Sequence, residues 1–286
     1  MKYRIERNTV QETLVIPLYA RKMCSQLFPS LYQDRTAAEL IEGIDYDFSV
    51  LERKSRSTLQ RFGFLEVAMR QYDLAWEVRD YLKAHPDAAV VNLGCGLDNT
   101  GRRCDNGRCR LYNLDFPDVI ALRNELLPPG EREENIPCDL NDTAWFRAID
   151  PAKGAVFFAS GVFYYFLKEQ VRALVQAMAE VFPGGRLVFD TANQTAVKLM
   201  LKTWVKGADI QDVKAYFAVR RARQELAPWA PGIEVSSRGF MLGYSDLKDP
   251  DVSGFFRFLA RVGDAAMDMQ IVRLGFPAGD GGRAGL

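Results

Sequence analysis

The chain has 286 residues, of which 48% are hydrophobic and 26% are charged, the composition of an ordinary soluble globular protein with one large core. Lysine plus arginine and aspartate plus glutamate both total 37, so the formal net charge is zero and no global field favours nucleic acid or an acidic membrane. We therefore expect neither nucleic acid nor a membrane among the partners.

The first seven residues carry charges where a signal peptide would need an apolar stretch. No uncharged run in the sequence reaches the roughly 18 residues that span a bilayer. We expect the protein to stay in the cytoplasm, with its five cysteines as reduced thiols. Cys104 and Cys109 are not expected to hold a metal, because no second pair follows and the only histidine is His85.

Residues 1–85 are expected to form an N-terminal helical segment. Asp34 can cap a helix over residues 35–44. From Ser57 onwards apolar positions recur every three or four residues, at Phe62, Leu65, Met69, Tyr72 and Trp76. Such a long amphipathic stripe needs an apolar surface on which to lie.

Residues 86–194 supply that surface by alternating short apolar runs with helical patterns, the rhythm of a parallel sheet covered on both faces. The expected strands are 88–93, 110–114, 135–138, 155–159 and 186–190, and the expected helices lie near 117–127, 143–149 and 168–182. Pro183-Gly184-Gly185 ends the last of these helices. This segment is the expected ligand-binding α/β core.

The rhythm changes after residue 190. Residues 195–206 and 209–226 predict two consecutive helical segments, which we interpret as a helical lid insertion over residues 195–232. Strands at 233–242 and 269–276 would complete a mostly parallel, seven-stranded sheet within residues 233–276. The Gly-rich residues 277–286 are expected to be disordered, and residues 1–286 are expected to form a single domain.

The strongest local signal is an apolar strand that runs into the turn Gly94-Cys95-Gly96. Glycines in such a turn let the backbone approach a ligand where a Cβ atom would collide. The third glycine of a dinucleotide fingerprint is missing, because Asn99 stands in its place. The turn therefore favours a ligand without a phosphate group, although a tight turn without ligand function gives the same pattern.

Acidic residues follow the next two expected strands. Asp115 comes about twenty residues after the glycines, the spacing at which α/β folds hold a ribose diol, and Asp139 is suited to an adenine amino group. Either aspartate is also explained as the N-cap of the helix that follows it.

A glycine and four aromatic residues follow the fourth expected strand, in the segment from Ser160 to Phe166. In open α/β sheets this carboxyl edge is where ligands bind, and aromatic faces there favour a sulfonium cation. Phe163 and Phe166 are equally well explained as core residues. Tyr164 and Tyr165 are better candidates for substrate contacts, because their hydroxyls need polar partners.

With these motifs together, the chain resembles the leucine carboxyl methyltransferase family, and within it the bacterial branch of tetracenomycin-type polyketide carboxyl O-methyltransferases. The resemblance covers most of the chain and rests on residues 13–22, Arg70, residues 91–98, 105–123, 160–166, 184–193 and the last strand. It implies a Rossmann-like class I fold and S-adenosyl-L-methionine as cofactor. It departs from the family pattern after Asp98, where Asn99-Thr100-Gly101 replace the usual Thr-Arg.

The resemblance also implies roles for basic residues. Arg70, with a basic residue of the pair Arg21-Lys22, would hold the methionine carboxylate of the cofactor. From the sequence alone, Arg70 is equally explained by a surface ion pair with Glu66 or Asp73. The full set of expected cofactor-binding residues is Arg21, Lys22, Arg70, Gly94, Cys95, Gly96, Asp115, Phe116, Asp139, Leu140, Ser160 and Gly161.

These observations favour an O-methyltransferase that acts on a small-molecule acid by in-line methyl transfer. General bases are most often histidines, and His85 precedes the first strand, so it is expected at the sheet edge opposite the glycine turn. A carboxylate needs no base, since with a reference pKa of about 4 it is already ionised at pH 7. The alternatives are methylation of a phenol or of a protein C-terminal carboxylate, a catalytically silent cofactor-binding protein, and an oxidoreductase.

Overall fold

The structure is a computed structural model that describes residues 2–5, 10–202 and 216–278. Its centre is a seven-stranded sheet with the order β5-β4-β3-β6-β7-β9-β8. The strands are β3 (Ala89–Leu93), β4 (Arg110–Asp115), β5 (Glu133–Pro137), β6 (Ala155–Ala159), β7 (Arg186–Thr191), β8 (Glu234–Gly239) and β9 (Gln270–Gly275). Only β9 runs antiparallel to its neighbours, so the expected mostly parallel sheet is confirmed.

The order of the strands reverses next to β3. Ala89 in β3 pairs with Arg110 in β4 on one side and with Ala155 in β6 on the other. Such a reversal opens a crevice beyond the carboxyl ends of the strands, where α/β sheets bind their ligands. The loops after β3 and β6 are therefore in position to form a common site.

Helices cover both faces of the sheet, because alternate residues of its buried strands point to opposite sides. On one face α4 (Thr58–Ala84) packs Leu74 and Val78 into the same apolar cluster as Phe158. On the other face α7 (Lys168–Val181) packs Val175 into a cluster with Phe157. Of the stripe predicted from Ser57, Phe62, Leu65 and Met69 are buried, whereas Tyr72 and Trp76 are half-buried. Ser57 caps this helix through Gln60 N.

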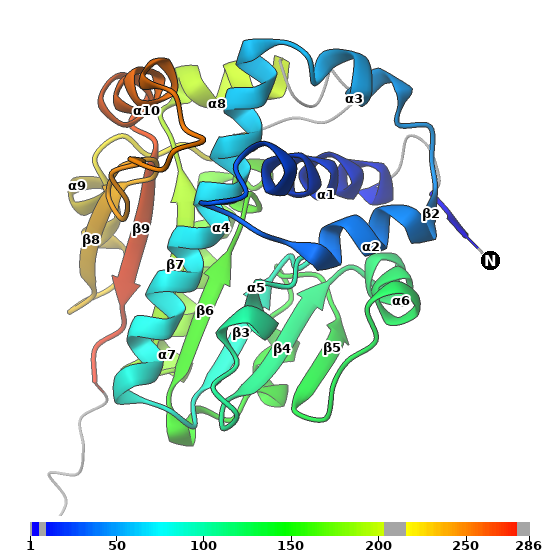
Figure 1. Ribbon diagram of the computed structural model, residues 1–286. Coiled ribbons are helices and arrows are strands. Elements are labelled where there is room, and N and C mark those ends of the chain that lie inside the picture. The colour runs from blue at the N-terminus through cyan, green and yellow to red at the C-terminus, as the bar shows by residue number, and fades with distance from the viewer. Residues whose placement is uncertain (1, 6–9, 203–215, 279–286) are drawn as a thin grey trace, which may run out of the picture.

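The other N-terminal helices lie over the carboxyl end of the sheet, as the blue ribbon in Figure 1 shows. They are α1 (Val10–Leu27), α2 (Arg35–Gly43) and α3 (Ser49–Lys54), and a small parallel pair of strands joins β1 (Tyr3–Arg4) to β2 (Ile44–Asp45). Asp34 caps α2 as expected, since its carboxylate accepts from Ala37 N at 3.0 Å. These helices close the crevice beyond β3 and β6 from above.

Shorter elements complete the core. They are α5 (Thr100–Cys104), α6 (Pro117–Leu126), η1 (Thr143–Ala148), η2 (Pro151–Lys153) and η3 (Phe163–Tyr165). The helix expected over 143–149 is thus a 3₁₀ turn, capped by Asp142 through Ala144 N. No helix among the described residues is long and apolar enough to cross a membrane. The described part of the chain also holds no group of three metal-ligating side chains, and Cys104 and Cys109 are buried, unpaired thiols.

The C-terminal third differs most from the sequence-based prediction. The first expected helix of the insertion is α8 (Gln194–Met200), but residues 203–215 lie outside the described part. Residues 216–221, expected to be helical, form an irregular segment instead. Phe217 and Val219 are buried in the core, and their backbone N–H groups donate to Tyr164 O and Ala192 O. Then follow α9 (Ala222–Leu226), η6 (Ala227–Trp229) and α10 (Gly254–Ala266), the last of which the sequence analysis missed. The tail from residue 279 onwards is outside the described residues.

Candidate active site

One large cavity lies at the carboxyl edge of the sheet, between β3, β6 and the helices α1, α4, α8 and α10. Its volume of about 790 Å³ falls within the range of roughly 300–1,000 Å³ that is usual for small-molecule sites. Expected site residues that line it are Arg21, Arg70, Gly94, Cys95, Gly96, Asp115, Phe116, Leu140, Ser160, Gly161, Tyr164 and Tyr165. The fold therefore brings almost all of the expected site residues to the same cavity.

The glycine turn after β3 has the conformation that its sequence implies. Gly94 and Gly96 have φ values of +63° and +46°, in the left-handed region that favours glycine. A Cβ atom on Gly94 would lie 2.6 Å from Val162, and one on Gly96 would lie 2.8 Å from Leu14. The turn is thus packed tightly between the β6 loop and α1, with its backbone facing the cavity.

Asp115 at the end of β4 fixes this turn. Its carboxylate accepts hydrogen bonds from Gly96 N at 2.7 Å and from Phe116 N at 2.8 Å. Burial raises the pKa of Asp115, while these two backbone donors lower it. The N-cap position of α6 belongs to Phe116, so Asp115 does not cap that helix, and the helix-cap alternative was wrong. Asp115 is left 9% exposed at the cavity wall, where its carboxylate can accept a ligand hydroxyl.

Arg21 enters the cavity from α1. Its guanidinium lies 3.3 Å from the Asp34 carboxylate and 3.5 Å from that of Asp98, and it donates to Leu97 O at 2.9 Å. Gln71 of α4 donates to the same Asp98 carboxylate at 3.1 Å. Two donors of Arg21, Nε and Nη1, lack a hydrogen-bond partner among the described residues. Lys22 is not part of the cavity wall, so of the expected basic pair only Arg21 reaches the site.

Arg70 enters from α4 and pairs with Asp190, at the end of β7, over 3.2 Å. Asp190 also accepts from Gly161 N at 2.6 Å and from the Tyr164 hydroxyl. Gly161 has φ +72°, and a Cβ atom there would lie 2.8 Å from Arg70 Nη1, so only glycine lets the β6 loop rest on the guanidinium. The surface ion pair considered for Arg70 was wrong, because its side chain is only 14% exposed and its partner is Asp190.

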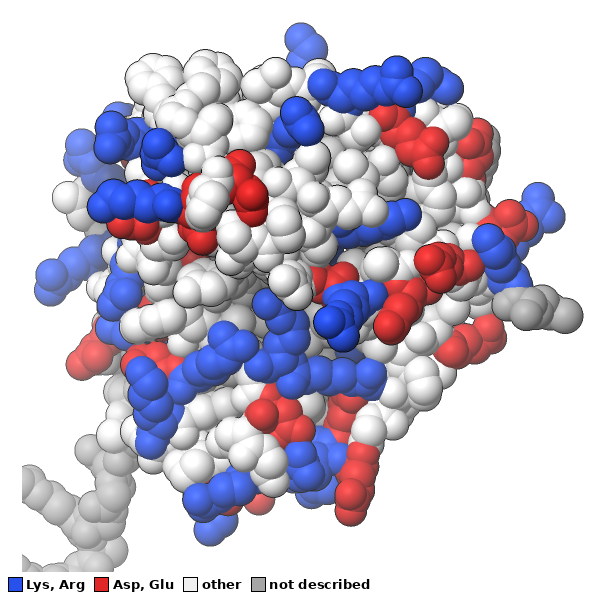
Figure 2. All heavy atoms as spheres, in the orientation of Figure 1, with Lys and Arg blue, Asp and Glu red and all other residues white. Residues whose placement is uncertain are grey.

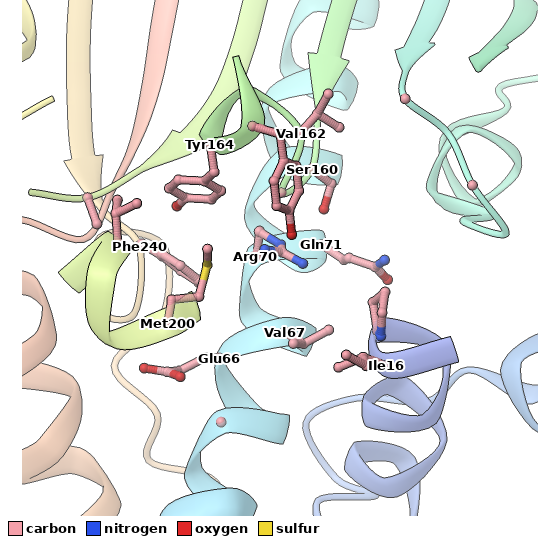
Figure 3. Close-up of a pocket in the computed structure, with 18 of the residues that line it drawn as sticks. Ile16, Glu66, Val67, Arg70, Gln71, Ser160, Val162, Tyr164, Met200 and Phe240 are labelled. Carbon is pink, nitrogen blue, oxygen red and sulfur yellow. The ribbon is translucent and has the colours of Figure 1, made fainter. Parts of the chain in front are cut away.

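The other aromatic residues after β6 divide between core and cavity. Phe163 is buried against Phe189 and Phe217, as the core alternative held. Phe166 is half-buried. It packs against the same apolar cluster as Phe163 and also lines the cavity. Figure 3 shows Tyr164 and Ser160 from the β6 loop beside Arg70 of α4.

Asp139, like Lys22, is an expected site residue that does not line the cavity. It is exposed, outside the cavity wall, and its carboxylate accepts from Asn141 N and Asn141 Nδ2 at 2.9 Å each. The reason is that β5 ends at Pro137, so the chain has already turned away at residue 139. Cys138, Leu140 and Asn141 of the same turn line the cavity instead.

Two acidic residues of the site escaped the sequence analysis. Asp190 binds Arg70 and also accepts a hydrogen bond from Gly161 N. Its position at the carboxyl end of an expected strand could have identified it as a site residue. Glu66 lies on α4 one turn before Arg70 and lines the cavity. Burial raises the pKa of Glu66 to about 7, against the opposing effect of Arg70. The spacing of four residues from Arg70 was visible in the sequence, but the apolar surroundings were not.

His85 lies at the opposite edge of the sheet, as expected. It caps the C-terminus of α4 and stacks on Tyr81, with ring centroids 4.4 Å apart. It lines a separate small cavity with Gly184 and Phe276, far along the strands from the glycine turn. The main cavity holds no described histidine.

Comparison with known proteins agrees with this geometry. A model of the family described as leucine carboxyl methyltransferase matches residues 15–179. The tetracenomycin polyketide synthesis O-methyltransferase TcmP of Streptomyces glaucescens is 30% identical over 182 residues, 63% of this chain and 65% of that protein. A protein of Parafrankia described as an S-adenosyl-L-methionine-dependent methyltransferase is 28% identical over 157 residues, 49% of this chain and 50% of that protein.

The fold also matches solved structures. A crystal structure described as a methyltransferase from Thermobifida fusca superposes with a TM-score of 0.58 at 16% identity, covering 91% of this chain and 94% of that one. At this identity the likeness concerns the fold. It confirms the expected class I methyltransferase fold, with its mostly parallel seven-stranded sheet and N-terminal helices.

Proposed function

The chain belongs to the leucine carboxyl methyltransferase family of S-adenosylmethionine-dependent enzymes, and on this premise we propose that it methylates the carboxylate of a small-molecule, polyketide-like acid. The curated relatives are matched over 65% and 50% of their lengths, so the substrate class is argued from the cavity itself. The observation that carries the proposal is the continuity of the cavity. It joins the glycine turn and Asp115 to a chamber with apolar walls.

The residues present fit the cofactor. The orphaned donors Arg21 Nε and Arg70 Nε are buried at the cavity, where a carboxylate would satisfy them. Asp115 offers its carboxylate to a ribose diol, and the turn at Gly94 and Gly96 offers backbone without a Cβ atom. The cofactor, when bound, supplies a methyl group already activated by its positive sulfur for in-line transfer to oxygen.

The contribution of this chain is then positioning and desolvation rather than proton transfer. Arg70, fixed by Asp190, would orient the cofactor from one side, and Asp115 from the other. Apolar side chains such as Met200 and Phe240 would exclude water around the substrate oxygen. A carboxylate acceptor is ionised at neutral pH, so the site needs no base for it.

A second candidate, methylation of a phenolic hydroxyl, is favoured by one observation. Glu66 faces the chamber, and its pKa of about 7 is the value at which a general base works best near neutral pH. This candidate predicts a rate that falls tenfold per pH unit below the pKa of the base. Methylation of a protein C-terminal carboxylate has no such observation in its favour.

The proposal is tested by incubating the protein with methyl-labelled S-adenosylmethionine and a panel of aromatic and aliphatic carboxylic acids. We expect a labelled methyl ester, from which mild alkali releases labelled methanol. Aryl methyl ethers are not cleaved by mild alkali. Alkali-stable label would favour the phenol. Calorimetry with S-adenosylhomocysteine and with NAD, run beside it, separates a methyltransferase from an oxidoreductase, and labelled product separates an enzyme from a catalytically silent cofactor-binding protein.

A further inference from the structure

Glu66 differs from the other charged side chains that line the cavity. Arg21, Arg70, Asp98 and Asp115 each have hydrogen-bond or ion-pair partners in the protein. No hydrogen bond or ion pair within the described residues reaches the carboxyl group of Glu66, whose main electrostatic neighbour is Arg70. A carboxyl group that faces a largely apolar cavity without a partner in the protein suggests a ligand that completes it.

The surroundings of Glu66 form what we call the apolar chamber, the part of the cavity lined by Phe62, Met200 and Phe240. Figure 3 shows Glu66 reaching toward Met200 on the side of Arg70 away from Gln71. Gln71 contacts Asp98, next to the glycine turn, so Glu66 lies on the substrate side of the cavity. The chamber is suited to the apolar body of a substrate rather than to the cofactor.

The chamber opens to the surface between the start of α4, α8 and α10. Leu59, Leu199 and Val262 line the cavity and are also 67%, 48% and 37% exposed. Figure 2 shows a largely uncharged surface over α10, whereas charges of both signs are interspersed over the rest of this face. An entrance edged by apolar side chains admits an apolar molecule and gives no attraction to a highly charged one.

We propose that Glu66 accepts a hydrogen bond from a hydroxyl group on the apolar body of the substrate, so that the methyl acceptor is a hydroxylated, ring-bearing acid. The inference rests on the proposed carboxyl methylation. A second carboxylate at this position would be repelled by an ionised Glu66. A cationic amine would add another positive charge near Arg70, one helical turn away, and near the positive sulfur of the cofactor. A hydroxyl group donates a hydrogen bond to Glu66 without adding a charge.

The experiment measures binding of 2-naphthoic acid and of its hydroxy derivatives, by their own fluorescence, to the protein saturated with S-adenosylhomocysteine. We expect at least one hydroxy isomer to bind about tenfold more tightly than 2-naphthoic acid, the effect of one hydrogen bond to a charged group. Glu66→Leu should abolish this preference. Glu66→Gln should keep part of it, because the amide oxygen still accepts a hydrogen bond.

Glu42→Gln is the matched control, since Glu42 is exposed on α2 and outside the cavity, and it should keep the full preference. All variants should bind S-adenosylhomocysteine as the original protein does, which shows that they are folded. Equal binding of hydroxylated and plain acids, or a preference that survives in Glu66→Leu, would overturn the inference and leave carboxyl methylation standing. Methylation of the hydroxyl itself in a parallel assay with labelled S-adenosylmethionine, lost in both Glu66 variants, would replace the inference with the general-base role. If no acid binds although S-adenosylhomocysteine does, the inference and the proposed function fail together.

Discussion

Asp115 holds the glycine turn through two backbone donors and turns the remaining part of its carboxylate toward the cavity. We predict that Asp115→Ala weakens binding of S-adenosylhomocysteine roughly 10- to 100-fold, since a hydrogen bond to a charged group contributes about 1.5–3 kcal/mol. Isothermal titration calorimetry measures the change. Asp139→Ala is the matched control, because that exposed aspartate binds only its own turn, and it should have no effect. An equal loss of affinity in both variants would contradict a specific role of Asp115 in binding the cofactor.

Asp73 of α4 is a buried carboxyl group without a hydrogen-bond partner among the described residues. Burial, together with the carboxylates of Asp264 and Glu77, raises its pKa to about 9. In the unfolded chain this pKa is about 3.9, so the folded state binds the extra proton and loses stability as the pH rises from about 4 to about 9. The group therefore destabilises the fold at neutral pH.

We predict that Asp73→Asn raises the free energy of unfolding at pH 8 by at least about 1 kcal/mol, because asparagine cannot ionise and so does not favour the unfolded chain at this pH. The gain should shrink as the pH approaches 4, where the aspartate is protonated in both states. Urea unfolding at the two pH values gives the comparison, with the exposed Glu42→Gln as a control that should show no gain. A gain of equal size at both pH values would show that ionisation of Asp73 is not the cause.

The sequence predicted site residues best where a single local rule applies. Gly94, Gly96 and Asp115 follow buried strands, and the carboxyl ends of parallel strands meet at one edge. Asp139 was predicted to line the site, but its strand ends one residue earlier than the pattern suggested, and its side chain is exposed. Asp190 was missed because its role depends on the contact between β7 and Arg70 of α4, which are far apart in the sequence. Glu66 was missed because the apolar side chains around it come from several elements.

At the scale of elements, α4 and the loop after β6 act together, because Gly161 rests on Arg70. We predict that Gly161→Ala weakens S-adenosylhomocysteine much more than adenosine, since it displaces the guanidinium that would bind the methionine carboxylate. Gly107→Ala is the matched control. Both glycines have positive φ, but a Cβ atom on Gly107 would meet nothing within 4 Å. Calorimetry with both ligands decides, and equal weakening of adenosine would contradict a carboxylate clamp.

Strands that are buried on both faces were predicted well. The strands β3, β4, β6 and β7 differ from expectation by at most a residue at each end, because they are buried on both faces and bounded by turn residues. The irregular residues 216–221 were taken for helix, because their run of Lys and Arg neighbours hides the burial of Phe217 and Val219. The helix α10 was missed although its sequence carries both an amphipathic pattern and a capping residue, Ser253, whose side chain accepts from Phe256 N.

At the scale of the whole molecule, His85 and the cavity lie at opposite edges of the sheet. We predict that His85→Ala keeps its turnover and that the rate on an accepted acid is nearly independent of pH between about 6 and 8, because the acceptor is already ionised. Initial rates across this window provide the measurement. A rate that rises tenfold per pH unit below pH 7 would instead indicate a base, and Glu66, with a pKa of about 7, is the group placed to act as one.

The central claim is that the acceptor oxygen belongs to a carboxylate. The most direct measurement compares methyl transfer from labelled S-adenosylmethionine to aromatic carboxylic acids and to phenols with the same ring skeletons, such as 2-naphthoic acid and 2-naphthol. Each molecule of such a pair has only one kind of acceptor oxygen, so the labelled product identifies the acceptor without further chemistry. The account predicts labelled methyl esters of the acids and no labelled ethers. Transfer to the phenols and not to the acids would contradict it.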